Sequence, residues 1–268
     1  VKYRIKESTA SNYRMKSEKH ILPSFGEKLI DSITQKDIYN FIDQKRKDRL
    51  SDRYIADIIF LIKGIFKYSV KTYHIFNPME GLVLPKRKNT EIQILDSSEQ
   101  SKLQEYISKN QNLGTLGTAL SYSTGIRVGE LCALQWEDIC LSQSTLKIKK
   151  TMQRIQVTDG VALTKPKIII TEPKSKCSVR NIPLPAFLIE MVNKFATVPQ
   201  AFILSGEANR YVEPRTMQNR FKSYVAESGI KNANFHALRH TFATRCVEVG
   251  FEIKSLSEIL GHANVNIT

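Results

Sequence analysis

Two prolines and a basic run interrupt the chain in its first half. Pro78 follows Asn77, and residues 84–89 read L-P-K-R-K-N. Proline lacks a backbone N–H and clashes with the preceding helical turn, so neither segment continues a helix. A chain of 268 residues is long enough for two domains. We therefore expect an N-terminal domain in residues 1–88 and a second domain in residues 89–268, joined by a basic linker.

Positive charge is concentrated before this break. The sequence has 40 Lys and Arg against 26 Asp and Glu, a formal net charge of +14. Residues 1–90 hold 19 of the basic and 10 of the acidic residues, a net charge of +9. Lysine and arginine gain affinity for phosphate backbones mainly by releasing condensed counterions. The composition favours nucleic acid as a partner over a merely soluble basic protein.

Composition also excludes several classes of protein. A 41% hydrophobic content is enough for packed cores, which excludes a disordered chain. The longest apolar stretch, residues 55–62, is interrupted by Asp57 and is too short to span a membrane. The four cysteines lie far apart, so neither a disulfide framework nor a zinc knuckle is expected. We expect a cytoplasmic protein, and a fragment, because the chain starts without Met.

Residues 1–88 have helical periodicity throughout. A first helix is predicted to begin at Ser8 or Ser11 and to end at Pro23. Thr34 is followed three residues later by an aspartate, which resembles a capping box and predicts a second helix. The first domain is therefore predicted to be all-helical.

A longer helix is predicted to begin at Ser51. Isoleucine and phenylalanine recur at helical spacing on one side, and lysines recur every four residues on the other. A solvated helix face is the ordinary explanation, but the net charge of the domain favours contact with a phosphate backbone. No base readout is predicted from this stripe. The predicted DNA-binding residues of stripe and linker are Lys63, Lys67, Lys71, Lys86, Arg87 and Lys88.

Residues 89–268 mix the periods of helices and strands. A helical shell around a small antiparallel sheet is the α+β pattern, and we expect this fold for the second domain. The predicted strands are residues 145–148, 154–157, 168–171 and 179–182. The predicted helices are residues 113–122, 127–134, 214–226, 236–249 and 253–260, preceded by one that starts after Ser97 or Ser98.

The first motif with chemical meaning is T-G-I-R-V-G-E-L at residues 124–131. A turn delivers Arg127 to the first turn of a helix, where free backbone N–H groups already favour an anion. Taken alone, an arginine at this position is usually a surface residue.

The second motif, H-A-L-R-H-T, occupies residues 236–241. His236, Arg239 and His240 share one helix face because they are three and four residues apart. Two histidines at this spacing can bind zinc, but Ala237 stands where a metalloprotease needs glutamate, and an arginine between the ligands repels a dication. A guanidinium fork matches phosphate oxygens instead, so we expect a phosphate site without metal or cofactor.

The third motif is L-G-H at residues 260–262. Gly261 is a plausible C-cap of the predicted helix before it, which places His262 at a helix end, where it can reach into a site. A single histidine in such a place is usually structural, so its significance depends on the other two motifs.

Together and in this order, the three motifs resemble the tyrosine site-specific recombinases, which include the integrases of phages and conjugative transposons. Residues 1–88 resemble the helical core-binding domain of that family, and residues 89–268 resemble its catalytic domain. The resemblance implies an enzyme that cleaves and rejoins DNA through a 3′-phosphotyrosyl intermediate to integrate or excise a mobile element. It implies no need for ATP, because the covalent link keeps the bond energy, and no need for metal, because guanidinium groups carry the charge.

The resemblance also implies roles for residues. Arg127 and Arg239 contact the non-bridging oxygens of the scissile phosphate, His236 is an acid/base group and His262 is a further donor. His240 is expected to be structural. Glu130 either braces Arg127 or lies on the helix surface.

A lysine on a β-hairpin of the family protonates the leaving 5′-oxygen. Lys174 and Lys176 are two residues apart, so both face the same way on an extended strand and either could reach the DNA. We favour Lys174 because it follows Pro173 and precedes the turn, which leaves Lys176 as a DNA contact.

The nucleophilic tyrosine of the family follows the last histidine at a distance greater than the six residues between His262 and Thr268. None of the ten tyrosines of this chain lies in that place. We therefore expect that residues 1–268 are truncated before the nucleophile and are inactive as they stand.

The resemblance finally implies partners: duplex DNA carrying core sites, three further copies in a tetramer on two sites, and a directionality factor, in the nucleoid. Two alternatives stay open. One is an accessory DNA-binding protein of the same fold without catalysis, which the convergence of arginines and histidines disfavours. The other is a type IB topoisomerase-like enzyme, which the separate basic domain disfavours.

Overall fold

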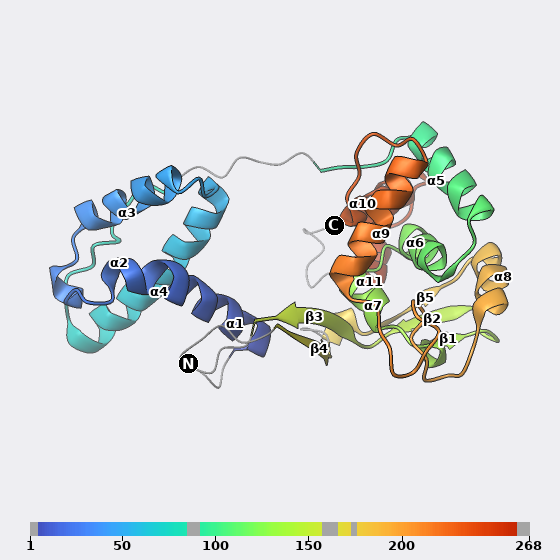
Figure 1. Cartoon of the computed structure of the whole chain (residues 1–268), viewed down its shortest axis with the longest axis horizontal. Coiled ribbons are helices and arrows are strands. Elements are labelled where there is room, and N and C mark those ends of the chain that lie inside the picture. Colours follow the sequence, from blue (N-terminus) through green and yellow to red (C-terminus); the bar gives the residue numbers. More distant parts are fainter. Residues whose placement is uncertain (1–4, 85–91, 157–165, 173–175, 262–268) are drawn as a thin grey trace. The chain divides into compact units, whose positions relative to one another are not determined.

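The computed structural model describes residues 5–84, 92–156, 166–172 and 176–261 (Figure 1). The chain forms two compact units. Unit 1 comprises residues 1–90 with 155–166, and unit 2 comprises residues 91–154 with 167–268. Each unit has its own cluster of buried apolar side chains. Among the described residues, none of the helices combines the length and apolar character that a membrane span needs.

The first unit is helical, and its elements are short except for the last one. Its elements are α1 (Glu7–Lys16), the π-helical η1 (Ser17–Ile21), α2 (Leu22–Phe25), the 3₁₀-helical η2 (Ile30–Ser32), α3 (Gln35–Lys47) and α4 (Asp52–Tyr73).

The first predicted helix begins and ends elsewhere. Its N-cap is Lys6, so neither Ser8 nor Ser11 caps it. Pro23 does not end it, because the chain first passes through the π-helical turn η1. Pro23 then falls in the first turn of α2. The backbone stays right-handed helical from η1 into α2, so Pro23 lies within a continuous helical segment, where its missing N–H removes one helical hydrogen bond.

The other two predicted starts in this unit are confirmed. The hydroxyl of Thr34 accepts a hydrogen bond from the backbone N–H of Asp37, whose carboxylate accepts one from the N–H of Thr34 in return. Ser51 caps α4 through the N–H of Tyr54. The isoleucine face of α4 then packs on α3, so the cap and the apolar stripe together fix this helix.

The second unit is mainly helical with two small sheets, which confirms the predicted fold class. Its helices are α5 (Ser97–Lys109), α6 (Leu113–Thr124), α7 (Val128–Ala133), η3 (Trp136–Asp138), η4 (Lys176–Ser178), α8 (Ala186–Phe195), α9 (Pro214–Glu227), α10 (Phe235–Glu248) and α11 (Ile253–Leu260). Its strands are β1 (Ile139–Cys140), β2 (Thr145–Ile148), β3 (Thr151–Ile155, of which the last residue belongs to unit 1), β4 (Lys167–Thr171) and β5 (Arg180–Pro183).

Helix α8 was not predicted. It follows Pro185 directly, and no side chain caps its first turn. An uncapped apolar stretch cannot be assigned to helix or strand from periodicity alone, so the usual start signal was missing.

The sheet of β1, β2 and β5 is antiparallel, and it positions one charged residue. In the pairing of β2 with β5, Leu146 lies opposite Ile182 and Ile148 lies opposite Arg180. Alternate residues of β5 are buried, so Arg180 and Ile182 face the interior together. An arginine thus occupies a core-facing position of the sheet.

Helix α6 lies at the centre of this unit and is buried along most of its length. It packs against α5, α7, α8, α9 and α10. The turn after α6 lies beside α10, because the carbonyl oxygen of Gly125 accepts a hydrogen bond from Arg239 of that helix.

Candidate active site

The turn between α6 and α7 presents Arg127. Gly125 ends α6 with a φ of 65°, a left-handed conformation that glycine adopts without strain. A Cβ at this position would lie 2.6 Å from the ring of Phe242 and 2.8 Å from the side chain of Leu260. Both backbone and packing therefore require glycine here. Arg127 follows as the half-buried N-cap residue of α7.

Arg239 reaches the same place from α10. It is only 5% exposed. Its Nη1 donates to the carbonyl oxygen of Gly125 at 2.7 Å, and its Nη2 donates to that of Leu260 at 2.8 Å. The Leu260 oxygen also accepts a longer hydrogen bond, of 3.4 Å, from Nη1 of Arg127. The structure thus brings the two predicted arginines together where α6 and α11 end.

Glu130 joins this group from the first turn of α7, and it does brace Arg127. Its buried carboxylate accepts hydrogen bonds of 2.9 Å from both Nη1 and the backbone N–H of Arg127. Arg180 donates to the same carboxylate through Nη1 and Nη2 at 3.2 and 2.9 Å. Burial alone would raise the pKa of Glu130, but these hydrogen bonds and charges hold it below its ordinary value. Glu130 is therefore an anion at neutral pH.

Arg180 is a residue that sequence reasoning missed. Besides Glu130, its guanidinium binds the carbonyl oxygens of Ser178 and Ile259. A Cβ on Gly261 would lie 3.0 Å from Nη1 of Arg180. One buried side chain therefore joins β5, the end of α11 and the bracing carboxylate of Arg127. The sequence could have indicated that Arg180 is buried, because it lies two residues before Ile182 in a predicted strand and so shares the same face.

The charges of this cluster do not balance. Among the residues that the structure describes, Arg127, Arg180 and Arg239 surround one carboxylate, that of Glu130. Burial lowers the pKa of Arg239 to about 9, and the positive charge of Arg127 adds to this effect while Glu130 opposes it. A buried excess of positive charge is stabilised when an anion enters. The cluster therefore favours an anion as its ligand.

His236 and His240 extend the cluster along α10. Their rings meet edge to face, with centroids 4.6 Å apart. Desolvation lowers the pKa of His236, and the charges of His240, Arg239 and Arg127 lower it further. His236 is therefore neutral at pH 7, with one ring nitrogen able to donate and one able to accept. Among the described residues, no group of three or more His, Cys, Asp and Glu is arranged to hold a metal ion.

Of the remaining predicted site residues, some are described by the structure and others lie outside the described residues. Lys63, Lys67 and Lys71 are described and lie exposed on α4. The others lie outside the described residues, except for the backbone of Lys176, which belongs to η4. Those outside are Lys86, Arg87, Lys88, Lys174 and His262.

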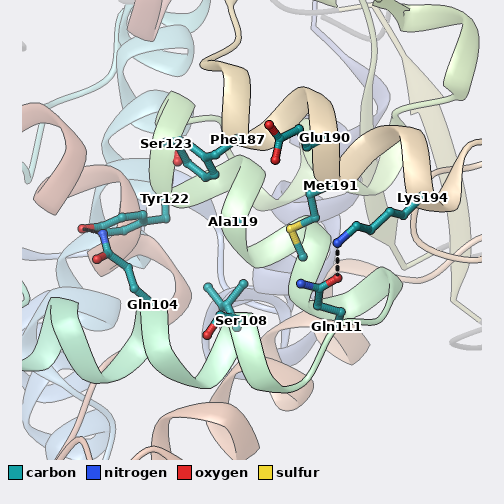
Figure 2. A pocket seen from close by; sticks show the side chains of 11 residues that line it. Gln104, Ser108, Gln111, Ala119, Tyr122, Ser123, Phe187, Glu190, Met191 and Lys194 are labelled. Atoms are coloured by element: carbon teal, nitrogen blue, oxygen red, sulfur yellow. Dashed lines mark hydrogen bonds between the residues drawn. The ribbon is translucent and has the colours of Figure 1, made fainter.

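A pocket of about 410 Å³ lies elsewhere in this unit, between α5, α6 and α8 (Figure 2). Tyr122 and Gln104 line one end, and Lys194 donates a hydrogen bond to Gln111 at the other. None of the arginines of the cluster lines it. The predicted site residues Arg127, His236 and Arg239 lie together outside this pocket. We therefore place the candidate active site at the arginine cluster.

We expect Arg180→Ala to lower the free energy of unfolding by about 3 kcal/mol. Removing one partner of a buried ion pair leaves the other charge under-compensated. The matched control is Arg210→Ala, which removes an arginine whose ion pair with Glu207 is exposed, and which should leave stability nearly unchanged. Urea unfolding of the three proteins measures the difference. Equal stabilities for both variants would contradict the bracing role of Arg180.

Comparisons with known families and curated proteins cover nearly the whole chain. Residues 88–268 match the phage integrase family, and residues 1–46 match the phage integrase N-terminal SAM-like domain. A tyrosine recombinase XerC-like protein of Caldanaerobacter subterraneus subsp. tengcongensis is 30% identical over 263 residues, which are 90% of this chain and 66% of that protein. The tyrosine recombinase XerA of Pyrococcus furiosus is 30% identical over 240 residues, covering 88% of this chain and 75% of that protein.

Solved structures share the fold. The Tn1549 transposon integrase in complex with a circular intermediate DNA has a TM-score of 0.80 at 21% identity, covering 99% of this chain and 89% of that one. A lambda integrase dimer bound to a core site has a TM-score of 0.71 at 21% identity, covering 99% of this chain and 88% of that one. A lambda integrase tetramer bound to a Holliday junction has a TM-score of 0.70 at 20% identity, covering 98% and 70%.

Proposed function

The chain belongs to the phage integrase family, and on that premise we propose that it is a site-specific recombinase, which cleaves and rejoins DNA through a 3′-phosphotyrosyl link. The observation that carries this proposal is the buried cluster of three arginines around one carboxylate. Such a cluster suits a phosphodiester whose charge increases during reaction. The reaction integrates or excises a mobile element.

In the proposed mechanism, Arg127 and Arg239 hold the two non-bridging oxygens of the scissile phosphate. When a tyrosine oxygen attacks, negative charge grows on these oxygens in the pentavalent transition state. Donors that are already fixed stabilise this charge without reorganising. Arg239 is fixed by two backbone carbonyl groups, and Arg127 is fixed by Glu130, which Arg180 holds in turn. Covalent capture keeps the bond energy for rejoining, so ATP is not needed.

The histidines and lysines complete the proposed chemistry. His236, neutral at pH 7, exchanges a proton with the attacking tyrosine. His262 donates a further hydrogen bond to the phosphate. Lys174 gives the proton that the departing 5′-oxygen needs, and Lys176 contacts the DNA beside it. His240 supports the ring of His236 without taking part in the chemistry.

We further propose that no tyrosine of residues 1–268 is the nucleophile, which comes from sequence beyond Thr268. Two tyrosines of the second unit, for example, have hydroxyl groups that are already hydrogen-bonded within the fold. Tyr122 donates to Gln100 at 2.9 Å and accepts from Arg245 at 2.6 Å. Tyr106 donates to Glu227 at 2.6 Å, and desolvation together with that contact raises its pKa to about 12. These phenols are engaged in structural contacts.

The proposed partner is duplex DNA. Lys63, Lys67 and Lys71 on α4, together with Lys86, Arg87 and Lys88, contact its phosphates. By analogy with the lambda integrase tetramer on a Holliday junction, the active assembly is a tetramer on two DNA sites. A directionality factor decides between integration and excision, and the protein works at the nucleoid.

Binding of duplex DNA should weaken steeply with salt. Each neutralised phosphate contributes a slope of about −0.9 to a plot of log K against log salt concentration. We therefore expect replacement of the three lysines of α4 with alanine to reduce the slope by roughly 3. Fluorescence anisotropy between low and moderate salt measures this.

The matched control for this measurement is Lys109→Ala, which removes an exposed lysine of α5 that is paired with Glu105. The control should keep the slope of the unmodified chain. An affinity that does not change with salt would refute the proposed DNA partner. An accessory DNA-binding protein without catalysis would show the same salt slope. Only a measurement of DNA cleavage distinguishes it from a recombinase.

A further inference from the structure

One face of α4 is exposed and rich in basic and aromatic side chains. The opposite face is buried in the core of the first unit. On the exposed face, Phe60 and Tyr68 are 66% and 61% exposed. From Ile58 to Tyr73 the helix contains three lysines and no acidic residue. Two large exposed rings on a cationic helix indicate a surface that contacts a partner.

Gly64 lies at the centre of this exposed face. It is four residues after Phe60 and four before Tyr68, so the three positions follow one another along the same side of the helix. Glycine is the least favourable residue in a helix interior apart from proline. The sequence therefore accepts a less stable helix at this position.

The fold itself does not explain this glycine. A Cβ on Gly64 would meet no atom within 4 Å, and the residue has an ordinary helical backbone. Gly125 is the contrasting case, since its φ and its neighbours both exclude a side chain. What Gly64 provides is a gap in the side-chain layer, between two aromatic rings.

We propose that Gly64 is the point at which duplex DNA approaches the axis of α4 most closely, with Phe60 and Tyr68 in contact with base edges on either side. This inference rests on the proposed function and adds to it a role in base readout. The major groove is wide enough for an α-helix, and apolar rings can contact thymine methyl groups there. Lys63, Lys67 and Lys71 reach the phosphates at the rim.

Charge complementarity favours DNA over a protein as the occupant of this face. A protein interface usually loses charged residues at its centre, and lysine in particular is depleted there. This face instead carries lysines one turn apart on both sides of Gly64 along the helix. Such spacing fits a phosphate backbone that runs past the helix.

The test is a pair of substitutions at this one position, Gly64→Ala and Gly64→Gln. Both residues are good helix formers and both fit the open space. Each should raise the melting temperature of the first unit, by about 4 °C. Each should also weaken binding of a duplex that the unmodified chain has selected from a random-sequence library. We expect a loss of about tenfold for alanine and a larger loss for glutamine.

The matched control is Asn40→Ala, at an exposed position of α3. It brings a similar gain in helix propensity, so it should raise the melting temperature and leave DNA affinity within about twofold. Replacing every thymine of the duplex by uracil removes the methyl groups. This base change should weaken DNA binding by the unmodified chain more than it weakens DNA binding by the Phe60→Ala variant.

Three outcomes would overturn the inference. One is equal DNA affinity in the unmodified chain and both Gly64 variants. Another is a lower melting temperature in those variants, which would mean that the fold requires the glycine. The third is a change in oligomeric state with unchanged DNA affinity, which would assign the face to a protein contact. Failure of the unmodified chain to bind any duplex would instead refute the proposed function.

Discussion

Arg239→Lys should lower the rate of DNA cleavage by about 100-fold to 1,000-fold in a form of the protein extended beyond Thr268 to include the nucleophile. Arg239 spans two carbonyl oxygens, those of Gly125 and Leu260, with its two terminal nitrogens. Lysine keeps the charge but offers a single nitrogen, so it cannot hold both carbonyl groups and a phosphate in a fixed geometry. Single-turnover cleavage of a nicked duplex measures the rate.

A second arginine of α10 supplies the control for this experiment. Arg245 donates to the hydroxyl of Tyr122 and lies over its ring, at the pocket between α10 and α8 rather than in the arginine cluster. Arg245→Lys makes the same chemical change in the same helix and should leave the cleavage rate within about threefold. DNA affinity should stay similar in both variants, because each keeps its charge. An unchanged rate in Arg239→Lys would contradict the proposed role.

Lys174→Ala should abolish cleavage of ordinary DNA in the extended protein and regain much of it on a 5′-bridging phosphorothiolate. A 5′-alkoxide is a poor leaving group and needs a proton as the bond breaks. A thiolate has a conjugate acid with a much lower pKa and leaves without this help. The comparison of both substrates with each variant therefore isolates the proton donor.

Lys176→Ala is the matched control for this pair of substrates. As a DNA contact, Lys176 should show a smaller defect that is equal on both substrates. If the phosphorothiolate restores cleavage by Lys176→Ala instead, Lys176 is the proton donor and Lys174 is the DNA contact. If neither variant is rescued, Lys174 is not the donor and His236 is the next residue to test.

Local signals in the sequence predicted much of the fold. The capping pair of Thr34 and Asp37, the cap at Ser51 and the glycine end of α11 each depend on a few neighbouring residues, and the structure has them where the sequence predicted. The π-helical turn before Pro23 was not predicted, because nothing local distinguishes it from an ordinary helix end. Helix α8 was missed because it has no cap.

The candidate site was predictable only in part, for a related reason. Arg127 and Arg239 were found through motifs, and the structure adds that both bind the end of α11. The pairing of Arg180 with Glu130 joins residues that are 50 positions apart. Such a contact depends on strand register and helix packing, which periodicity does not specify. The excess of positive charge became visible only when these residues were seen together.

The central claim is that the arginine cluster activates a phosphodiester for attack by a tyrosine that lies outside residues 1–268. The most direct test incubates a nicked suicide duplex with the protein and looks for a covalent adduct on a denaturing gel. We expect the 268-residue chain to bind the duplex and form no adduct, and we expect the extended protein to form one that Arg239→Lys removes. An adduct formed by the 268-residue chain itself, or one that survives in Arg239→Lys, would contradict the claim.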